Sequence, residues 1–303
     1  MYRRMSLNVA RSAASVFGWG ATVVAVCACS GCRPAPLADI TRLTDARRSA
    51  ADAFVQFVKT ADAGNRAVMA DTDEASQTFA REAEVASRAV SRDVEHLTSL
   101  LHDLGAAEES RLLQEFAARF AEYTSVDREI LTLAVENTNL KAQRLSFGPA
   151  QVAAEEFHDA LRTIDQVEGA SPDFRVRATI ATAVAAAREV QVLQAPHIAE
   201  SDEAQMSHLE ARAAEAEAEA RRSLGQLDRI VSPKARPKLA AATSALESFI
   251  AVNAQIVTLS RRNSNVRSLA LSLGQKRTLA AACEERLQAL QDSLASRGFA
   301  GSR

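Results

Sequence analysis

Residues 123–150 read YTSVDREILTLAVENTNLKAQRLSFGPA, and residues 249–276 read FIAVNAQIVTLSRRNSNVRSLALSLGQK. The second stretch lies 126 residues after the first, and the two align without a gap. Apolar residues, asparagines and glycines recur at the same places: Val126 with Val252, Ile130 with Ile256, Leu133 with Leu259, Asn137 with Asn263, Asn139 with Asn265, and Gly148 with Gly274. Upstream, residues 72–75 match residues 201–204 at a spacing of 129. The sequence therefore predicts an internal duplication.

Within each copy the apolar residues fall three or four positions apart, as on one face of a helix. One such stripe runs through Phe116, Phe120, Tyr123, Val126, Ile130 and Leu133. A single helical hairpin would expose its stripe to water, whereas two hairpins packed together bury it. We therefore predict an all-α fold, an elongated antiparallel four-helix bundle of two stacked modules, with Ile130 and Ile256 inside.

The domain plan follows from the repeats and the breaks between them. We expect a signal peptide over residues 1–31, a tether over 32–37 and one helical body over 38–300. Each repeat is expected to have a long arm, a shorter arm, a glycine break and a short third helix. In repeat 1 (38–168) the three helical parts are 38–104, 106–146 and 149–168. In repeat 2 (172–297) they are 172–230, 234–272 and 275–297. Each repeat should supply two helices to every layer. Elements at 71–74 and 200–203 are expected to punctuate the long arms, with Thr72 or Ser201 as helix caps.

Composition excludes several classes of protein. The formal net charge is −2, which is far from the strongly basic balance of a general nucleic-acid coat, so no nucleic-acid partner is expected. Few of the 303 residues are Gly (11) or Pro (7), which argues against collagen-like or proline-rich disorder. Aromatic residues make up only 5%, and β-branched runs are scarce, which argues against an all-β domain.

The N-terminus has the pattern of an export signal. Three arginines precede an uncharged stretch at 12–31, which ends in Ser30-Gly31-Cys32. This ending resembles a bacterial lipoprotein signal, and the resemblance implies that Cys32 is lipidated and becomes the first mature residue. Cleavage there would remove three arginines and no acid, changing the formal charge from −2 to −5. An uncleaved membrane anchor and a simple cleaved signal remain open as alternatives.

The order of helices resembles the helical bimodular sensor domains of methyl-accepting chemotaxis proteins, and the simpler four-helix-bundle sensors of that superfamily. The residues that carry the resemblance are Tyr123-x6-Ile130-Leu131-x-Leu133-x3-Asn137-x2-Leu140-x-Ala142 and the copy Phe249-x6-Ile256-Val257-x-Leu259-x3-Asn263-x2-Val266. The resemblance implies that a small ligand, often an organic acid, binds between the helices of a module. The sequence departs from that family by ending at Arg303 without a second membrane span or signalling rod. Transmembrane signalling by this chain alone is therefore not expected.

Three polar residues are the candidate ligand contacts. Asn137 and Asn263 fall on the buried stripe, where an unpaired amide costs about 1–3 kcal/mol. They either fix the register of the helices by bonding across the bundle, or form a polar layer that faces a ligand. Arg144 lies seven residues after Asn137 and would share its stripe. It could bind a carboxylate through its guanidinium fork, or extend to the surface and pair with an acid.

Signals for catalysis and metal binding are weak, so we predict no enzyme, no cofactor and no metal. Glu155-x-x-His158 has the form of half a di-iron site, but the sequence has no second Glu-x-x-His. Glycine-rich phosphate loops and a Gly-x-Ser-x-Gly elbow are also missing from the sequence. Cys283 occupies the position of Phe157 in the other repeat, which predicts a small buried apolar side chain.

Two functions fit these features. The first is an exported, lipid-anchored, sensor-like bundle in the cell envelope, facing the periplasm or the exterior, that binds a small solute or a membrane receptor. The second is a structural or adaptor lipoprotein that bridges protein partners without a small ligand. A polar pocket containing Asn137, Arg144 or Asn263 would favour the first, and apolar layers there would favour the second. The ligand, the membrane, and whether the chain forms a homodimer are left open.

Overall fold

The computed structural model describes residues 37–169 and 173–300, and every element in these ranges is helical. The elements are α1 (Leu37–Val68), α2 (Asp73–Asp103), α3 (Ala107–Glu136), α4 (Thr138–Leu145), the π-helical turn η1 (Ser146–Ala150), α5 (Gln151–Glu168), α6 (Phe174–Ala199), α7 (Glu203–Ile230), α8 (Arg236–Arg262), α9 (Ser264–Leu271), the π-helical turn η2 (Ser272–Lys276) and α10 (Arg277–Ala300). The predicted all-α fold is confirmed.

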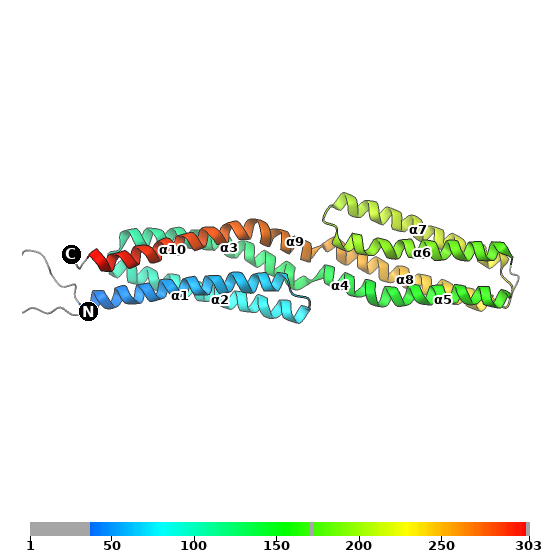
Figure 1. The fold of residues 1–303 in the computed structure, drawn as a ribbon, viewed down its shortest axis with the longest axis horizontal. Helices are drawn as coiled ribbons and strands as arrows, with labels where there is room; N and C mark the ends of the chain where they lie inside the picture. The colour runs from blue at the N-terminus through cyan, green and yellow to red at the C-terminus, as the bar shows by residue number, and fades with distance from the viewer. Residues whose placement is uncertain (1–36, 170–172, 301–303) are drawn as a thin grey trace, which may run out of the picture.

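These helices form two four-helix bundles placed end to end along a rod (Figure 1). α1, α2, α3 and α10 make up the bundle at the end where the described chain begins and ends, which we call the terminal bundle. α5, α6, α7 and α8 make up the other, which we call the distal bundle. Two helical runs, α3–α4–η1–α5 and α8–α9–η2–α10, pass through both bundles and meet at a waist between them (Figure 1).

The two long arms expected from the sequence are hairpins instead. The chain turns back between α1 and α2, and again between α6 and α7, so each arm of about 60 residues becomes two antiparallel helices. N-caps start the second helix of each pair. Thr72 Oγ1 accepts from Ala75 N at 3.1 Å, as predicted, whereas Asp202 rather than Ser201 caps α7, by accepting from the amides of Ala204 and Gln205.

This folding back changes how the repeats share the bundles. The terminal bundle takes α1, α2 and α3 from the first repeat and only α10 from the second, and the distal bundle takes α6, α7 and α8 from the second and α5 from the first. The expectation of two helices from each repeat per layer was therefore wrong. Because each bundle needs one helix from the other repeat, the two halves of the sequence share both interiors.

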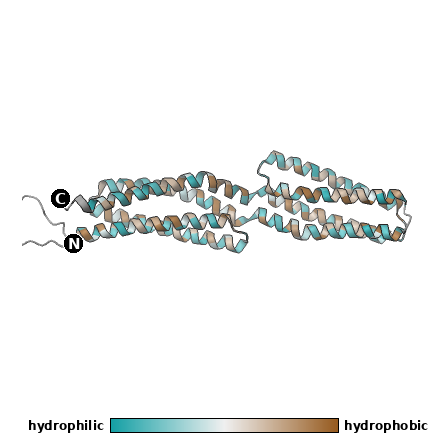
Figure 2. Cartoon of the chain, in the orientation of Figure 1, coloured by the Kyte–Doolittle hydropathy of each residue, from teal (hydrophilic) through white to brown (hydrophobic). Residues whose placement is uncertain are grey.

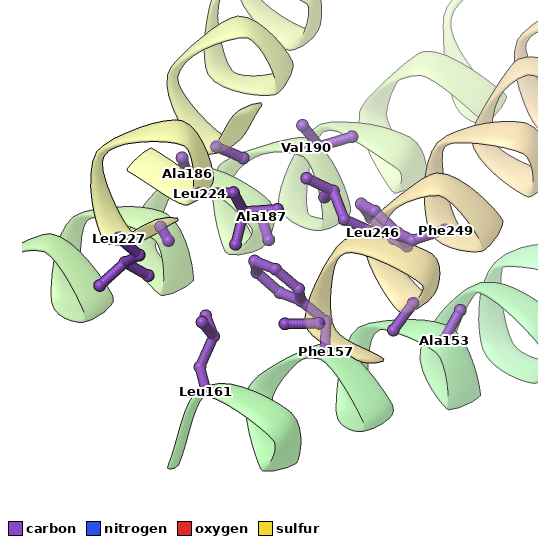
Figure 3. Close-up of a cluster of buried hydrophobic side chains, with 14 of the residues drawn as sticks. Ala153, Phe157, Leu161, Ala186, Ala187, Val190, Leu224, Leu227, Leu246 and Phe249 are labelled. Carbon is purple, nitrogen blue, oxygen red and sulfur yellow. The ribbon is translucent and has the colours of Figure 1, made fainter. Parts of the chain in front are cut away.

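Apolar side chains fill both interiors, as the predicted stripes require. Ile130 and Ile256 are 0% and 1% exposed. In the distal bundle, Phe157 lies among smaller side chains of the facing helices (Figure 3). In the terminal bundle an aromatic cluster of Phe57, Phe116, Phe120 and Tyr123 has ring centroids 5.1–6.3 Å apart. Hydrophilic and hydrophobic residues alternate along the helices of both bundles, as amphipathic helices do (Figure 2).

The two through-running helices are interrupted at corresponding places. Asn137 and Asn263 take the left-handed conformation (φ 49° and 54°) and separate α3 from α4 and α8 from α9. Nine residues later each run enters a π-helical turn, η1 or η2. Gly148 and Gly274 lie inside these turns, so the glycine breaks predicted there widen the helix without ending it. The 126-residue spacing of these features fits a duplication, which stays a prediction.

Candidate functional site

The waist is held together by reciprocal hydrogen bonds between the starts of α4 and α9. Thr138 N donates to Ser264 Oγ and Ser264 N donates to Thr138 Oγ1, both at 3.0 Å. Asn139 and Asn265 exchange the same kind of bond, each backbone amide donating to the other's Oδ1 at 3.1 Å. Each helix start therefore has two of its free amides satisfied by the side chains of the other.

Asn137 and Asn263 complete this arrangement without bonding each other. Asn265 Nδ2 donates to Asn137 Oδ1 at 2.9 Å, and Asn139 Nδ2 donates to Asn263 Oδ1 at 2.8 Å. Asn263 Nδ2 donates to the carbonyl of Glu200 at 2.7 Å, whereas the buried Nδ2 of Asn137 has no partner. These contacts cross between the helical runs, as the register-fixing interpretation of the two asparagines requires.

Arg144 lies apart from the two asparagines. Its side chain is 49% exposed, and it makes a 3.5 Å ion pair with Asp73 and a hydrogen bond to the carbonyl of Asp71. The left-handed residue at 137 interrupts the helix, so counting seven positions from Asn137 does not lead back to the same face. The structure thus brings Asn137 and Asn263 together at the waist and places Arg144 on the surface.

A buried charge pair, which the sequence analysis did not predict, lies inside the terminal bundle. Lys276, the last residue of η2, places Nζ 2.6 Å from Asp127 Oδ1 of α3, and the two side chains are 3% and 6% exposed. The Tyr123 ring centroid lies 5.7 Å from Nζ, and the Tyr123 hydroxyl is buried without a partner. We call Tyr123, Asp127 and Lys276 the charged cluster.

Gly64 of α1 makes room for this cluster. A Cβ added at Gly64 would lie 2.3 Å from Lys276 Nζ and 3.0 Å from Asp127 Oδ1. The lysine head therefore occupies the space that a side chain on α1 would take. Any larger residue at position 64 would have to displace a charged group from its partner.

Burial dominates the electrostatics of the cluster. It raises the pKa of Asp127 above its ordinary value, although the Lys276 ammonium acts in the opposite direction. Burial also raises the pKa of Tyr123, and the nearby Asp127 charge adds to the effect. Taking two charges out of water can cost more than their mutual attraction returns, so a buried ion pair is weak evidence of a stabilising role.

A groove opens beside the cluster between α2 and α3. Its volume is about 640 Å³, and its lining includes Ala80 and Arg88 of α2 with Thr124, Asp127 and Leu131 of α3. The groove is large enough for a small organic molecule. Asp127 is the residue that belongs both to the groove and to the charged cluster.

The corresponding layer of the distal bundle is uncharged. At the 126-residue spacing, Phe249, Asn253 and Ala150 occupy the places of Tyr123, Asp127 and Lys276. There Gln194 donates to Asn253 Oδ1 at 3.0 Å and accepts from the Ser146 hydroxyl at 2.7 Å. Since the amide of Gln194 is satisfied on both sides, the charged cluster is a property of the terminal bundle.

A second buried network, around His197, was also not found from the sequence. His197 is 4% exposed, with Nδ1 2.6 Å from Ser260 Oγ and Nε2 2.8 Å from Glu210 Oε1. Arg261 binds the same carboxylate through Nε and Nη2, and this hydrogen bonding lowers the pKa of Glu210. Ser260 Oγ is buried against the carbonyl of Ile256, so the group ties α6, α7 and α8 together and presents no accessible nucleophile.

The remaining candidates lie as follows. Cys283 is fully buried, as predicted, and burial raises the pKa of its thiol to about 12. Glu155 and His158 line a separate surface hollow between α5 and α6. Within residues 37–169 and 173–300, no three His, Cys, Asp or Glu side chains are grouped closely enough to hold a metal ion. Cys32 lies outside the described residues.

Comparisons with known proteins add no relative. No protein-family model, curated protein or solved structure matches the chain. By length and composition, Arg236–Arg297 is the one stretch of the described residues that could cross a membrane. The same stretch runs through both bundles as α8, α9, η2 and α10, and the core helix of a bundle meets that criterion equally well.

Proposed function

We propose that the protein is an exported, lipid-anchored helical bundle that binds a small organic acid between the helices of its terminal bundle. The observation that carries this proposal is the charged cluster, whose buried polar atoms outnumber their partners. Buried polar groups in proteins are normally satisfied, and each exception calls for an explanation. A bound solute that supplies the missing partners is such an explanation.

The chemistry of the cluster suits a carboxylate. The Lys276 ammonium has three donors, and its ion-pair partner is Asp127 alone. A solute carboxylate that enters from the groove past Asp127 would accept from the ammonium and from the Tyr123 hydroxyl. A second negative charge beside Asp127 would raise the pKa of that carboxyl further. Binding would therefore take up a proton and strengthen as the pH falls.

A thermal-shift screen of small carboxylates tests this function. A specific ligand at about 100 times its Kd stabilises the native state by about 2.7 kcal/mol, so one carboxylate should raise the melting temperature clearly. The corresponding alcohol or amide should not, because it offers Lys276 no charge. Absence of a shift with every carboxylate would contradict the proposal.

The anchor is tested separately by mass spectrometry of the mature N-terminus. We expect a chain that begins at Cys32 and carries the mass of attached lipid, and Cys32→Ser should abolish both features. An unmodified N-terminus beyond Cys32, or an intact signal segment, would overturn the lipid anchor. Neither result bears on whether the terminal bundle binds a solute.

The second candidate is an adaptor that bridges partners, and the shape of the rod favours it. From the start of α3 to the end of α5 the helical run spans about 90 Å at 1.5 Å per residue. Large apolar side chains are exposed along this length, with Phe147 67% and Leu273 64% exposed on the two π-helical turns. Recovery of a protein partner together with a negative carboxylate screen would favour the adaptor.

A further inference from the structure

The free end of the distal bundle carries exposed cations that have no partner. This end is formed by the last turns of α5 and α7 and the first turns of α6 and α8 (Figure 1). Ser232 N, between α7 and α8, donates to Glu168 Oε1 at the end of α5 at 2.7 Å. Among the described residues, five exposed side chains here form neither an ion pair nor a side-chain hydrogen bond: Arg175, Arg229, Lys234, Arg236 and Lys238. We call these five residues the tip cations.

The tip cations are placed against the local electrostatics of the helices. α6 and α8 both begin at this end, so the positive ends of two helix dipoles already point there. The first turns of these helices contain no acid and include Arg175 and Arg236, although Asp173 caps α6 by accepting from Arg175 N, whereas α1, α2, α3 and α7 all have acids in their first turns. Four of the tip cations, all but Arg229, lie within or next to these first turns. Such placement disfavours the free protein and favours an anionic partner.

The opposite end of the rod lacks this excess. There Arg42 pairs with Asp39, Arg111 with Glu108, and Arg297 with the buried carboxylate of Glu109. Around the distal end, residues 159–177 and 226–238 together contain seven Lys or Arg and five Asp or Glu, and Arg162 is paired with Asp159, in a chain whose formal charge is −2. Of the two ends of the described rod, the distal end therefore carries the excess of positive charge.

Apolar side chains accompany the cations. Phe174, the first residue of α6, is 76% exposed and adjoins Arg175, and Val167 in the last turn of α5 is 39% exposed. An aromatic side chain among unpaired Lys and Arg suits an interface between anionic headgroups and acyl chains, where the ring enters and the cations remain at the headgroups.

We propose that the tip of the distal bundle docks on an anionic lipid surface, with Phe174 entering the bilayer and the tip cations contacting the headgroups. The described chain begins and ends at the other end of the rod, so this contact leaves the far end of the terminal bundle about 90 Å away. The docking does not depend on solute binding or on Cys32.

Vesicle capture by the full chain tests the docking. The chain is fixed through a C-terminal histidine tag to neutral phosphatidylcholine vesicles that contain a nickel-chelating lipid, which leaves the tip free. Fluorescent vesicles of phosphatidylcholine, with or without phosphatidylglycerol, are then added. We expect capture only of vesicles that contain phosphatidylglycerol, with a loss of capture at high salt. Capture of neither kind, or retention of soluble heparin without vesicle capture, would overturn the proposal.

Matched variants locate the contact. A cation near an anionic bilayer strengthens binding about fivefold, so replacing Arg175, Lys234, Arg236 and Lys238 by Gln should weaken capture on the order of a hundredfold or more. The control replaces Lys59, Arg81, Arg92 and Arg128, four exposed cations on the sides of the terminal bundle that form no ion pair, by Gln. Equal loss of capture in both variants would show that net charge, and not the tip, is responsible.

Insertion of the aromatic ring has its own readout. In a Phe174→Trp variant, brominated lipids confined to the captured vesicles should quench the introduced tryptophan. The one natural tryptophan, Trp19, lies in the predicted signal peptide, so in a chain that begins at Cys32 the introduced residue 174 is the one tryptophan. Capture without quenching would overturn the insertion of residue 174.

Discussion

At the residue scale, Lys276 determines what the terminal bundle can do. Its ammonium is held between Asp127, the Tyr123 ring and Gly64, and little of the side chain reaches water. Burying such a pair in the core costs several kcal/mol per ion, which pairing recovers only in part. The bundle therefore maintains a costly group at this place, which is the reason that we propose a binding site there.

Removing one member of the pair should harm the protein more than removing both. We expect Lys276→Met or Asp127→Leu alone to lower the free energy of unfolding by about 3–5 kcal/mol, because each leaves a buried charge uncompensated. The double variant should lose much less than the sum of the two. Urea unfolding of the four proteins measures this coupling, and additive losses would show that the two groups do not interact.

Gly64 should resist substitution for a reason specific to Lys276. Gly64→Ala would ordinarily stabilise a helix by about 0.5–1 kcal/mol, but here the new Cβ must displace the ammonium and should cost about 1–3 kcal/mol. Gly225→Ala in α7 is the control, since nothing lies within 4 Å of its added Cβ, and it should stabilise. Denaturation midpoints compare the two, and stabilisation by both would mean that Lys276 moves aside freely.

The raised pKa of Asp127 fixes the sign of a pH effect. Its native pKa lies above its unfolded value of about 3.9, so the native state holds this proton more tightly. The resulting stability is complete below the unfolded pKa and is lost as the pH rises through the native pKa. Subtracting the pH profile of Asp127→Asn from that of the natural protein should reveal this decline. A difference that grows with pH would contradict the raised pKa.

At the element scale, the two interrupted helices connect the bundles. A left-handed residue costs about 1–2 kcal/mol unless it is Gly or is stabilised locally, and Asn tolerates it best among the other residues. Asn137 and Asn263 combine that tolerance with side-chain bonds across the waist. Each residue thus both interrupts its helix and fastens it to the other run.

Substitutions at Asn263 should separate these two contributions. Asn263→Gly keeps the left-handed backbone but loses the bonds to Asn139 and to the carbonyl of Glu200, at about 0.5–1.5 kcal/mol each. Asn263→Ala loses the same bonds and adds the strain of about 1–2 kcal/mol. Unfolding free energies should fall in the order Asn, Gly, Ala. An alanine variant as stable as the glycine variant would mean that the backbone relaxes out of the left-handed region.

The sequence predicted the helices and the breaks at the waist, but not where the chain reverses direction. Periodicity reports which face of a helix is buried, so Ile130 and Ile256 were placed correctly inside. Periodicity does not report a reversal inside a continuous pattern, so the turns after α1 and α6 were taken for interruptions within straight arms. Counting seven positions from Asn137 also placed Arg144 on the buried stripe. The left-handed Asn137 interrupts the helix, so the residues after it no longer follow the same face, and this interruption was not predicted.

The charged cluster escaped detection for a different reason. Tyr123, Asp127 and Lys276 come from segments about 150 residues apart, and Lys276 is buried only because η2 and Gly64 create its space. Nothing in the sequence around Lys276 sets it apart from an exposed lysine. Comparison of the two copies could have drawn attention to the pair. At the positions that correspond to Lys276 and Asp127, the other copy has the uncharged residues Ala150 and Asn253.

At the scale of the whole molecule, two four-helix bundles joined end to end have different interiors. Each bundle takes three helices from one half of the sequence and one from the other. The two runs that meet at the waist therefore belong to both bundles. The distal bundle keeps a neutral, satisfied layer around Gln194, and the terminal bundle keeps a charged, unsatisfied one. This difference is why we assign solute binding to the terminal bundle.

Isothermal titration of three proteins with the carboxylate that gives the largest thermal shift tests that assignment most directly. The natural protein and a Gln194→Leu variant, which alters the equivalent layer of the distal bundle, should bind it with similar Kd values. Lys276→Gln should weaken binding about tenfold or more, because a charge-assisted hydrogen bond contributes about 1.5–3 kcal/mol. Undiminished binding by Lys276→Gln, with loss in Gln194→Leu, would contradict the assignment.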